Sequence, residues 1–366
     1  MRLLIATPLY PPESGGPATY AKILETELPL QGVEVGLVKF GEFKKYPKVI
    51  RHILYFFALL KALKDSDVLL ALDPVSTGFP AALAAGVMRK TFVVKIVGDY
   101  AWEQGTQRSG ITATLDVFVQ EKRVPFQVAC MRSVQRFVAN RAVRVIVPSE
   151  YLKRIVQAWR IPGEKIEVIP NAQPKGTVGV VPEIVSSLSR PRIVSVARLV
   201  PWKGMDGVID MVASLKEEMP EVSLVIVGNG PERERLTRKA EGTLGSSALL
   251  TGELSHGETL AVIKDADLFV LNSTYEGLSH LLIEALSLGA AVVATNVGGN
   301  PELIKDQENG LLIPSGDQEA LERACRKVLK DLDLKEKIRA AAPASVSGYT
   351  QDIMIERTIA LLHSLV

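Results

Sequence analysis

Short apolar runs that alternate with longer amphipathic segments constrain the fold of this chain most strongly. The first half has six runs rich in Val, Ile and Leu, at residues 3–7, 33–40, 68–72, 92–97, 144–147 and 166–169. Continuous apolar runs of this length are typical of strands buried on both faces of a parallel sheet. Helix-like segments lie between them, at residues 18–28, 49–63, 79–88, 115–140 and 150–159. This alternation predicts right-handed βαβ units in a doubly wound sheet.

The same alternation begins again after a polar stretch at residues 171–189. Strands are predicted at residues 193–196, 224–227, 248–250, 268–271, 291–295 and 311–313. Helices are predicted at residues 205–217, 232–241, 258–266, 281–288, 318–329 and 352–365. We therefore predict an α/β protein with two Rossmann-like doubly wound domains that face a cleft, with a hinge at residues 170–182. The domains are residues 1–172 and 173–349, with the helix at 350–366 packing back on the first. Ligands are expected at the carboxyl ends of the strands.

Composition excludes several other classes of protein. A chain of 366 residues with 47% hydrophobic and 23% charged residues is an ordinary globular protein, long enough for two domains. Its apolar runs are shorter than the roughly 18 residues that cross a bilayer, and its first residues read as a strand, not a signal peptide. Two widely separated Cys and four scattered His favour neither a disulfide framework nor a metal centre. We expect a cytoplasmic protein without a metal or cofactor.

Charge is divided unequally along the chain. Residues 1–175 contain 24 Lys and Arg against 15 Asp and Glu, and the remainder contains 19 against 26. A basic half suits anionic partners such as phospholipid or acidic glycan, although a solvated surface is an equal alternative. Motifs of sequence-reading nucleic-acid modules are absent, so nucleic acid is not expected.

One basic segment, residues 44–57, also has an apolar helical stripe. Such a segment can rest on an anionic membrane surface, as a peripheral protein on its inner face does. Alternatively, it packs Ile53, Leu54, Phe56 and Phe57 into the core of the first domain. Both interpretations hold together if the exposed flank of the helix contacts lipid.

The most informative segment is residues 272–284, where a strand ends in a polar loop and a helix begins near Ser279. Ser279 is a suitable N-cap, and the N–H groups after it would form a phosphate site at the helix N-terminus. Glu276 and Glu284 are eight positions apart, about 12 Å along a helix axis, too far to act as a close catalytic pair. They can instead flank a bound anion and accept hydrogen bonds from hydroxyls, as a nucleoside diphosphate sugar requires.

Cations and glycines follow the neighbouring strands. Arg198 and Lys203 lie in the loop after the first strand of the second domain, where a guanidinium fork and an ammonium would stabilise a leaving diphosphate. Gly228 and Gly230 follow the next strand and allow close approach of backbone to a ligand. Taken alone, Arg198 and Lys203 are more typical of solvated loops, and it is the joint occurrence of these residues at strand ends that favours a site.

In this order, these motifs resemble the retaining glycosyltransferases of family 4, which have the GT-B fold and belong to the glycosyl transferases of group 1. The resemblance also includes Gly15-Gly16 and residues 294–302 and 309–314, and it is strongest from residue 195 to residue 316. It implies that Glu284 binds the ribose, that Arg198 and Lys203 bind the diphosphate, and that Glu276 binds the donor sugar.

The resemblance also implies a phosphate cradle of backbone groups. Gly16, beside Gly15, would contribute from the first domain, and Leu278, Ser279 and His280 from the second. The side chain of His280 is a further candidate for contact with phosphate or sugar.

The first domain departs from the family pattern at one position. A histidine facing the donor sugar usually ends one of its strands, whereas this chain has Val97-Gly98 there and Asp99 as the nearest ionisable side chain. Asp99 positions the acceptor hydroxyl or takes its proton, or, as an equal alternative, it caps the segment that follows.

The resemblance implies a metal-independent enzyme that moves a hexosyl group, with retention of configuration, from a nucleoside diphosphate sugar. Uridine diphosphate is expected more than guanosine diphosphate. The acceptor would be a hydroxyl of a glycan or lipid-linked molecule in cell-envelope or exopolysaccharide synthesis. A nucleotide-sugar 2-epimerase of the same fold and a catalytically inactive nucleotide-sugar-binding protein remain alternatives. A dehydrogenase is disfavoured because no GxGxxG follows the first strand.

Overall fold

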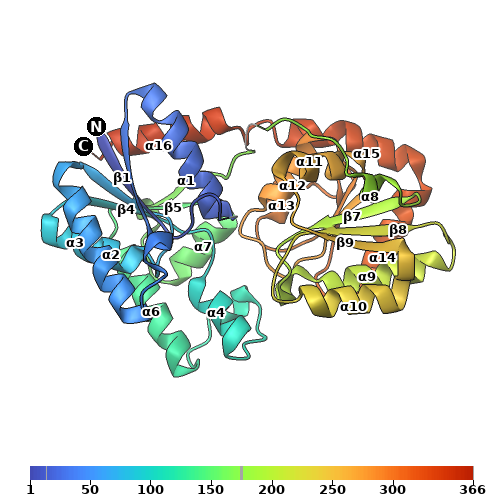
Figure 1. Cartoon of the computed structure of the whole chain (residues 1–366), viewed down its shortest axis with the longest axis horizontal. Coiled ribbons are helices and arrows are strands. Elements are labelled where there is room, and N and C mark those ends of the chain that lie inside the picture. Colours follow the sequence, from blue (N-terminus) through green and yellow to red (C-terminus); the bar gives the residue numbers. More distant parts are fainter. Residues whose placement is uncertain (14, 174–175, 366) are drawn as a thin grey trace. The chain divides into compact units, whose positions relative to one another are not determined.

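The computed structural model describes residues 1–13, 15–173 and 176–365, and of Lys48 it describes the backbone alone. The chain divides into two compact units. Unit 1 consists of Met1–Pro174 with Thr350–Val366, and unit 2 is Lys175–Tyr349. Figure 1 shows a layered α/β arrangement in each unit.

Unit 1 is built on a six-stranded sheet with the order β2-β1-β3-β4-β5-β6. Every recorded pairing in it is parallel. Its strands are β1 (Arg2–Thr7), β2 (Glu34–Lys39), β3 (Val68–Ala71), β4 (Thr91–Lys95), β5 (Arg144–Val147) and β6 (Ile166–Val168). Each overlaps one of the predicted runs, with β1 and β4 beginning one residue earlier, because a parallel sheet covered on both faces needs apolar side chains in both directions.

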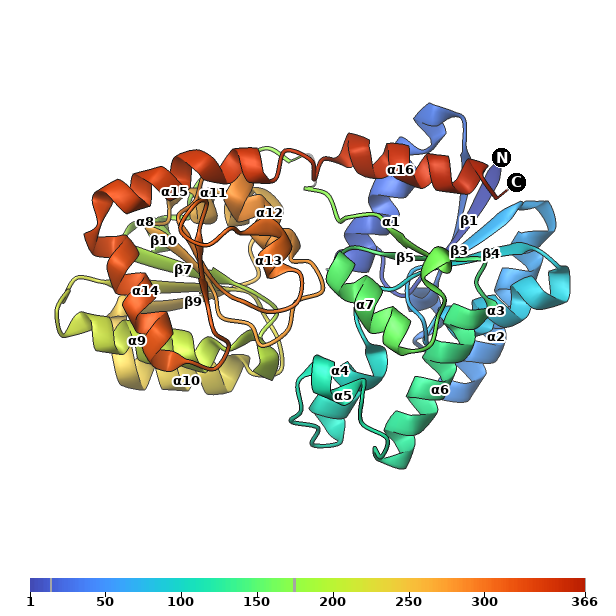
Figure 2. The ribbon, with the colours of Figure 1, turned by 180° about the vertical axis from the view of Figure 1, so that it is seen from behind.

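Helices cover both faces of this sheet. The helices of unit 1 are α1 (Gly16–Glu27), α2 (Lys48–Ala62), α3 (Gly78–Met88), α4 (Tyr100–Arg108), α5 (Leu115–Phe118), α6 (Phe126–Arg141), α7 (Glu150–Ala158) and α16 (Gln351–His363), of which α4 packs against α6. Buried residues of α1 and α16 share one core cluster with β1, β3 and β4. Helices α2, α3 and α6 lie side by side on the other face (Figures 1 and 2).

Two helical predictions in unit 1 need correction. The single helix expected at residues 115–140 is two helices, α5 and α6, because Pro125 forces extended backbone before the second one begins. Packing of Ile53 and Phe57 into the core is also wrong: both are exposed on α2, while Tyr55 and Leu59 are fully buried. Periodicity identified an amphipathic helix but not which of its apolar residues face the sheet.

Unit 2 has a second six-stranded parallel sheet, with the order β12-β11-β10-β7-β8-β9. Its strands are β7 (Arg192–Val196), β8 (Ser223–Val227), β9 (Ala248–Gly252), β10 (Leu268–Leu271), β11 (Val292–Thr295) and β12 (Leu311–Ile313). Its helices are α8 (Glu183–Ser186), α9 (Met205–Lys216), α10 (Arg233–Leu244), α11 (His256–Asp265), α12 (His280–Ser287), α13 (Asn300–Leu303), α14 (Gln318–Lys330) and α15 (Leu332–Ser345).

The order of these strands creates a switch point between β7 and β10. The chain proceeds from β7 outward to β8 and β9, then returns to place β10 on the other side of β7. Loops after two such strands leave the sheet in opposite directions, so a crevice opens at their carboxyl ends. The segments that follow are residues 197–204 and 272–279, which carry the cations and Glu276. No helix in the described part of the chain is long and apolar enough to span a bilayer.

Candidate functional site

An ion pair joins the two loops at the switch point of unit 2. Lys203 ends a short 3-10 helix after β7, and its Nζ lies 2.6 Å from Oε1 of Glu276, in the loop after β10. The hydroxyl of Ser273 donates to the same oxygen at 2.7 Å. The carboxylate of Glu276 is buried, and no described residue hydrogen-bonds to its Oε2. One oxygen is therefore fixed, and the other is available to a ligand hydroxyl.

Arg198 lies in the same loop and is exposed. Among the described residues, none makes a hydrogen bond or an ion pair with its guanidinium. An exposed guanidinium in the same loop as the half-buried Lys203 can grip two oxygens of a phosphate in a bidentate manner. The structure therefore brings Lys203 and Glu276 into contact and leaves Arg198 available at the same strand end.

Glu284 lies within α12 and is buried. Its Oε1 is 3.0 Å from Nε2 of His256, the first residue of α11. This hydrogen bond raises the pKa of His256, against a smaller opposing effect of burial. The sequence around His256 does not indicate this role, since a lone histidine 28 positions before Glu284 gives no local signal of a partner. Only the packing of α11 against α12 brings the two residues together.

Glycines let the loops of the site pack backbone against backbone. A Cβ on Gly228, where φ is 134°, would lie 1.9 Å from the carbonyl oxygen of Ala197. A Cβ on Gly230 would lie 2.3 Å from that of Leu199. These two glycines hold the loop after β8 against the loop that carries Arg198, a function that sequence reasoning did not foresee. Their contact with a ligand remains a prediction.

The start of α12 is capped as expected. The hydroxyl of Ser279 accepts the N–H of Leu282, which satisfies one free donor of the first turn. Leu278 is buried in the core of unit 2, so only its backbone is suited to a ligand. His280 is the first helical residue and is half-buried. The phosphate cradle itself remains a prediction.

Two of the predicted site residues stand at the carboxyl end of β1 in unit 1. Gly15 is the N-cap of α1, with φ at 142°, and Gly16 is the first residue of that helix. A side chain at Gly15 would be strained because L residues rarely adopt this backbone conformation. The pair therefore turns the chain from the loop into α1.

Asp99 occupies the buried cap of α4. Its Oδ1 accepts the N–H of Trp102 at 2.9 Å, and its Oδ2 accepts the indole N–H of Trp159 at 3.1 Å. Burial raises the pKa of Asp99, although these hydrogen bonds oppose the change. The structure thus shows the capping alternative. Taking a proton from an acceptor would require Asp99 to break these bonds.

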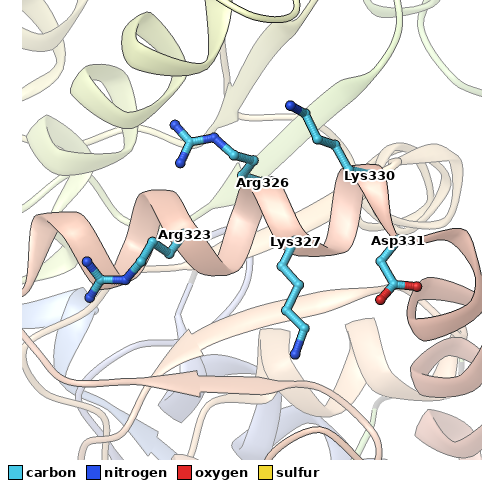
Figure 3. A pocket seen from close by; sticks show the side chains of 5 residues that line it. All are labelled: Arg323, Arg326, Lys327, Lys330 and Asp331. Atoms are coloured by element: carbon cyan, nitrogen blue, oxygen red, sulfur yellow. The ribbon is translucent and has the colours of Figure 1, made fainter.

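A separate hollow on unit 2 is lined by Arg323, Arg326, Lys327, Lys330 and Asp331 of α14 and its end (Figure 3). Helix α14 follows β12 and runs back along the sheet, so its last turns lie toward the amino ends of the strands. Arg326 and Lys330 pair there with Glu218. This hollow is not part of the site after β7 and β10.

The described residues contain no cluster of three or more His, Cys, Asp or Glu that could hold a metal ion. The structure shows two separate contacts between candidate site residues, Lys203 with Glu276 and His256 with Glu284, and that these pairs and Arg198 bind one ligand remains a prediction.

Two family models match the chain. Residues 4–172 match the glycosyl transferase 4-like domain, and residues 182–345 match the glycosyl transferases group 1. An uncharacterized glycosyltransferase of Methanocaldococcus jannaschii is 31% identical over 144 residues, 38% of this chain and 36% of that protein. The lipopolysaccharide core biosynthesis glycosyltransferase LpsE of Rhizobium meliloti is 29% identical over 203 residues, 55% of this chain and 58% of LpsE. The match thus spans less than two thirds of either relative.

The fold is also that of solved glycosyltransferase structures. Anabaena HepE in complex with UDP-glucose superposes with a TM-score of 0.77 over the whole of both chains, at 18% identity. Both halves of the chain thus match models of one kind of protein, in the order in which the two Rossmann-like units occur. The chain belongs to the glycosyl transferases of group 1 and has the GT-B fold.

Proposed function

We propose that this protein transfers a hexosyl group from a nucleoside diphosphate sugar to a hydroxyl of a glycan or lipid-linked acceptor, with retention of configuration. The ion pair of Lys203 with Glu276 at the switch point, beside the exposed Arg198, carries this proposal. Uridine diphosphate is the preferred nucleotide in the proposal because HepE, a structural neighbour, was solved with UDP and UDP-glucose. Cell-envelope or exopolysaccharide synthesis follows by analogy with LpsE.

Each side chain of the site has a role in the proposed reaction. The guanidinium of Arg198 and the ammonium of Lys203 stabilise the negative charge of the departing diphosphate. Glu276 accepts a hydrogen bond from a sugar hydroxyl through Oε2, since Oε1 is already held by Lys203 and Ser273. Glu284, oriented by His256, accepts hydrogen bonds from the ribose.

The proposed displacement takes place on one face of the sugar. The hydrogen-bond partners of the Glu276 side chain among the described residues are Lys203 and Ser273, neither of them an acid, so we do not propose a double displacement through two paired acids. The leaving diphosphate would instead accept the proton of the attacking hydroxyl as the bond between the anomeric carbon and the phosphate oxygen breaks and the new bond from the anomeric carbon to the acceptor oxygen forms. The two cations supply the charge neutralisation that a bound metal supplies elsewhere.

Nucleotide binding tests the donor site directly. A ligand at 100 times its dissociation constant stabilises a protein by about 2.7 kcal/mol, so UDP should raise the melting temperature. Lys203→Ala should abolish most of this rise. Lys239→Ala is the matched control. Lys239 also forms ion pairs, with Asp206 and Asp210, but these lie between α10 and α9 and not in the loops after β7 and β10. If neither UDP nor GDP changes the melting temperature at millimolar concentration, the donor site is misassigned.

Product analysis separates transfer from its alternatives. The full chain is incubated with labelled nucleotide sugars, with and without hydroxyl acceptors, and both released nucleotide and labelled sugar are measured. Release of UDP with label on the acceptor supports transfer. An epimerised nucleotide sugar without acceptor would establish the epimerase instead, and nucleotide binding without any turnover would establish a binding protein.

A further inference from the structure

Three adjoining helices of unit 1 carry no carboxylate. Residues 43–64, 74–98 and 122–149, which contain α2, α3 and α6, hold 15 Lys and Arg and no Asp or Glu. The whole of residues 1–175 has 24 Lys and Arg, so most of the positive charge of the basic half lies in these three stretches. The exposed side chains of α2, α3, α6 and their ends are called here the acid-free face.

These helices form one continuous surface. Helix α3 packs against both α2 and α6 on one side of the sheet (Figure 2). The rings of Phe79 on α3 and Phe137 on α6 have centroids 6.0 Å apart. At the other end of α3, a Cβ on Gly86 would lie 3.1 Å from Nη2 of Arg141 on α6.

Each helix exposes a row of apolar side chains at helical spacing. Val49 is 73% exposed on α2, Val87 is 66% exposed on α3, and Phe126 is 83% exposed on α6. The rows consist of Val49, Ile50, Ile53 and Phe57 on α2, Phe79, Leu83 and Val87 on α3, and Phe126 and Phe137 on α6. A single exposed apolar side chain is ordinary, whereas adjoining rows on neighbouring helices mark an interaction surface.

Positive side chains frame these rows. Exposed examples are Lys45, Lys61, Lys64, Arg89, Lys122, Arg123 and Arg141. Among the basic side chains that the structure describes in the three stretches, only Lys44 has an ion pair, with Glu13. Lys95 and Arg132 are buried and do not contribute to the face, whereas the exposed Lys and Arg side chains named above have no ion pair within the described residues and present their charge to a partner.

We propose that the acid-free face binds an anionic lipid bilayer, with its apolar rows entering the boundary between headgroups and acyl chains. Burial of apolar side chains and attraction of Lys and Arg to anionic lipid act together at such a boundary. A second copy of this chain would bring the same positive charge to the contact and be repelled. A nucleic acid would neutralise the charge but would leave the aliphatic side chains of α2 and α3, such as Val49, Ile53 and Val87, without a partner. This inference goes beyond the proposed transfer reaction and does not require it.

Vesicle flotation of the full chain tests the proposal. The protein should float with vesicles of phosphatidylcholine and phosphatidylglycerol, and much less with vesicles of phosphatidylcholine alone. The variant Val49→Ser/Ile53→Ser/Phe57→Ser removes the row of α2 and should lose most of this binding. Leu30→Ser/Ile184→Ser/Leu332→Ser is the matched control, because it removes three exposed apolar side chains outside the face and should bind as before.

A charge variant tests the electrostatic part separately. Each Lys or Arg near an anionic surface contributes about 1 kcal/mol, roughly fivefold in partitioning. Arg89→Glu/Arg141→Glu should therefore lower the partition coefficient at least ~25-fold, and added salt should reduce the difference. Arg323→Glu/Lys337→Glu reverses two exposed charges of unit 2 as the control.

The proposal is overturned if a variant of the acid-free face and its control lose vesicle binding equally. It is overturned too if vesicles without anionic lipid bind the protein as strongly as anionic vesicles do. Two further results would overturn it. The first is a wild-type dimer in light scattering that is lost in the α2 variant, with no vesicle binding by the wild type. The second is binding of duplex DNA by the face without binding of vesicles. The UDP-dependent rise in melting temperature, measured on the same variants, reports the donor site. Loss of vesicle binding with that rise intact therefore separates the two proposals.

Discussion

The pair formed by His256 and Glu284 links the candidate donor site to pH. Glu284 is buried while the side chain of His256 is 45% exposed, and their hydrogen bond raises the pKa of His256. In the proposed function Glu284 accepts hydrogen bonds from ribose hydroxyls, which requires a fixed orientation of its carboxylate, and a protonated imidazole fixes that orientation more strongly than a neutral one.

This pair predicts a pH-dependent stability difference. A histidine whose pKa is higher in the folded state stabilises that state below its unfolded pKa of about 6.5, and the contribution is lost as pH rises through the raised pKa. The difference in free energy of unfolding between wild type and His256→Gln should therefore be larger at pH 5.5 than at pH 8.5. Urea unfolding at both pH values measures it, and a difference that grows with pH would contradict the assignment.

Lys95 is a second titratable residue with an unusual environment. It ends β4 and is buried, and burial lowers its pKa to about 7. Its Nζ lies 4.0 Å from the centroid of the Tyr20 ring and has no hydrogen-bond partner in the described part of the chain.

The lowered pKa of Lys95 predicts that the protein becomes more stable as the pH rises above 7. Between pH 7 and about 10.4 the unfolded chain binds a proton at this lysine that the folded chain does not, so stability rises by up to ~1.4 kcal/mol per pH unit. Lys95→Met should be more stable than wild type at pH 7, and its advantage should shrink by pH 9.5. Chemical unfolding at both pH values checks this, and Lys90→Met, at a half-buried position just before β4, is the control.

At the scale of elements, the carboxyl ends of the strands in unit 2 are held by backbone contacts between loops. The N–H of Leu199 donates to the carbonyl of Asn229, and that of Gly228 to the carbonyl of Gly252. The N–H of Gly299 donates to the carbonyl of Glu276. These bonds fix the loops before any side chain meets a ligand, which is the preorganisation that transition-state stabilisation needs.

A pair of glycine variants tests this arrangement. Gly228→Ala should destabilise the protein by about 1–3 kcal/mol, since the new Cβ meets the carbonyl of Ala197. Gly242→Ala lies inside α10 with open space around it and should stabilise by about 1 kcal/mol. Denaturant unfolding gives both values, and Gly228→Ala should also weaken the UDP-dependent rise in melting temperature. Equal stabilities of the two variants would show that the loop contact is not tight.

At the scale of the whole molecule, helix α16 belongs to unit 1, which otherwise consists of the N-terminal part of the chain. Helix α16 follows unit 2 in sequence, yet its buried residues Met354, Ile355 and Leu362 lie in the core cluster of unit 1. Unit 1 is therefore complete only when the C-terminal segment has packed against it.

Truncation of one side chain in α16 should act on unit 1 alone. Leu362→Ala removes a fully buried side chain and should cost about 2–5 kcal/mol. Glu356→Ala, on the exposed side of the same helix, should cost far less. Calorimetry should show a lower transition temperature for unit 1 in Leu362→Ala and an unchanged nucleotide-dependent transition for unit 2. A shift of the nucleotide-dependent transition alone would contradict the division into units.

The amino-acid sequence determined where the strands lie, because a strand buried on both faces must be a short, nearly continuous apolar run. It also identified the residues of the switch-point loops, since cations and carboxylates at strand ends are a local pattern. Tertiary structure alone decided that Lys203 bonds to Glu276, that His256 bonds to Glu284, and that Ile53 and Phe57 are exposed. These outcomes depend on how helices and loops distant in sequence pack around the sheets, and periodicity within a segment does not specify its partner.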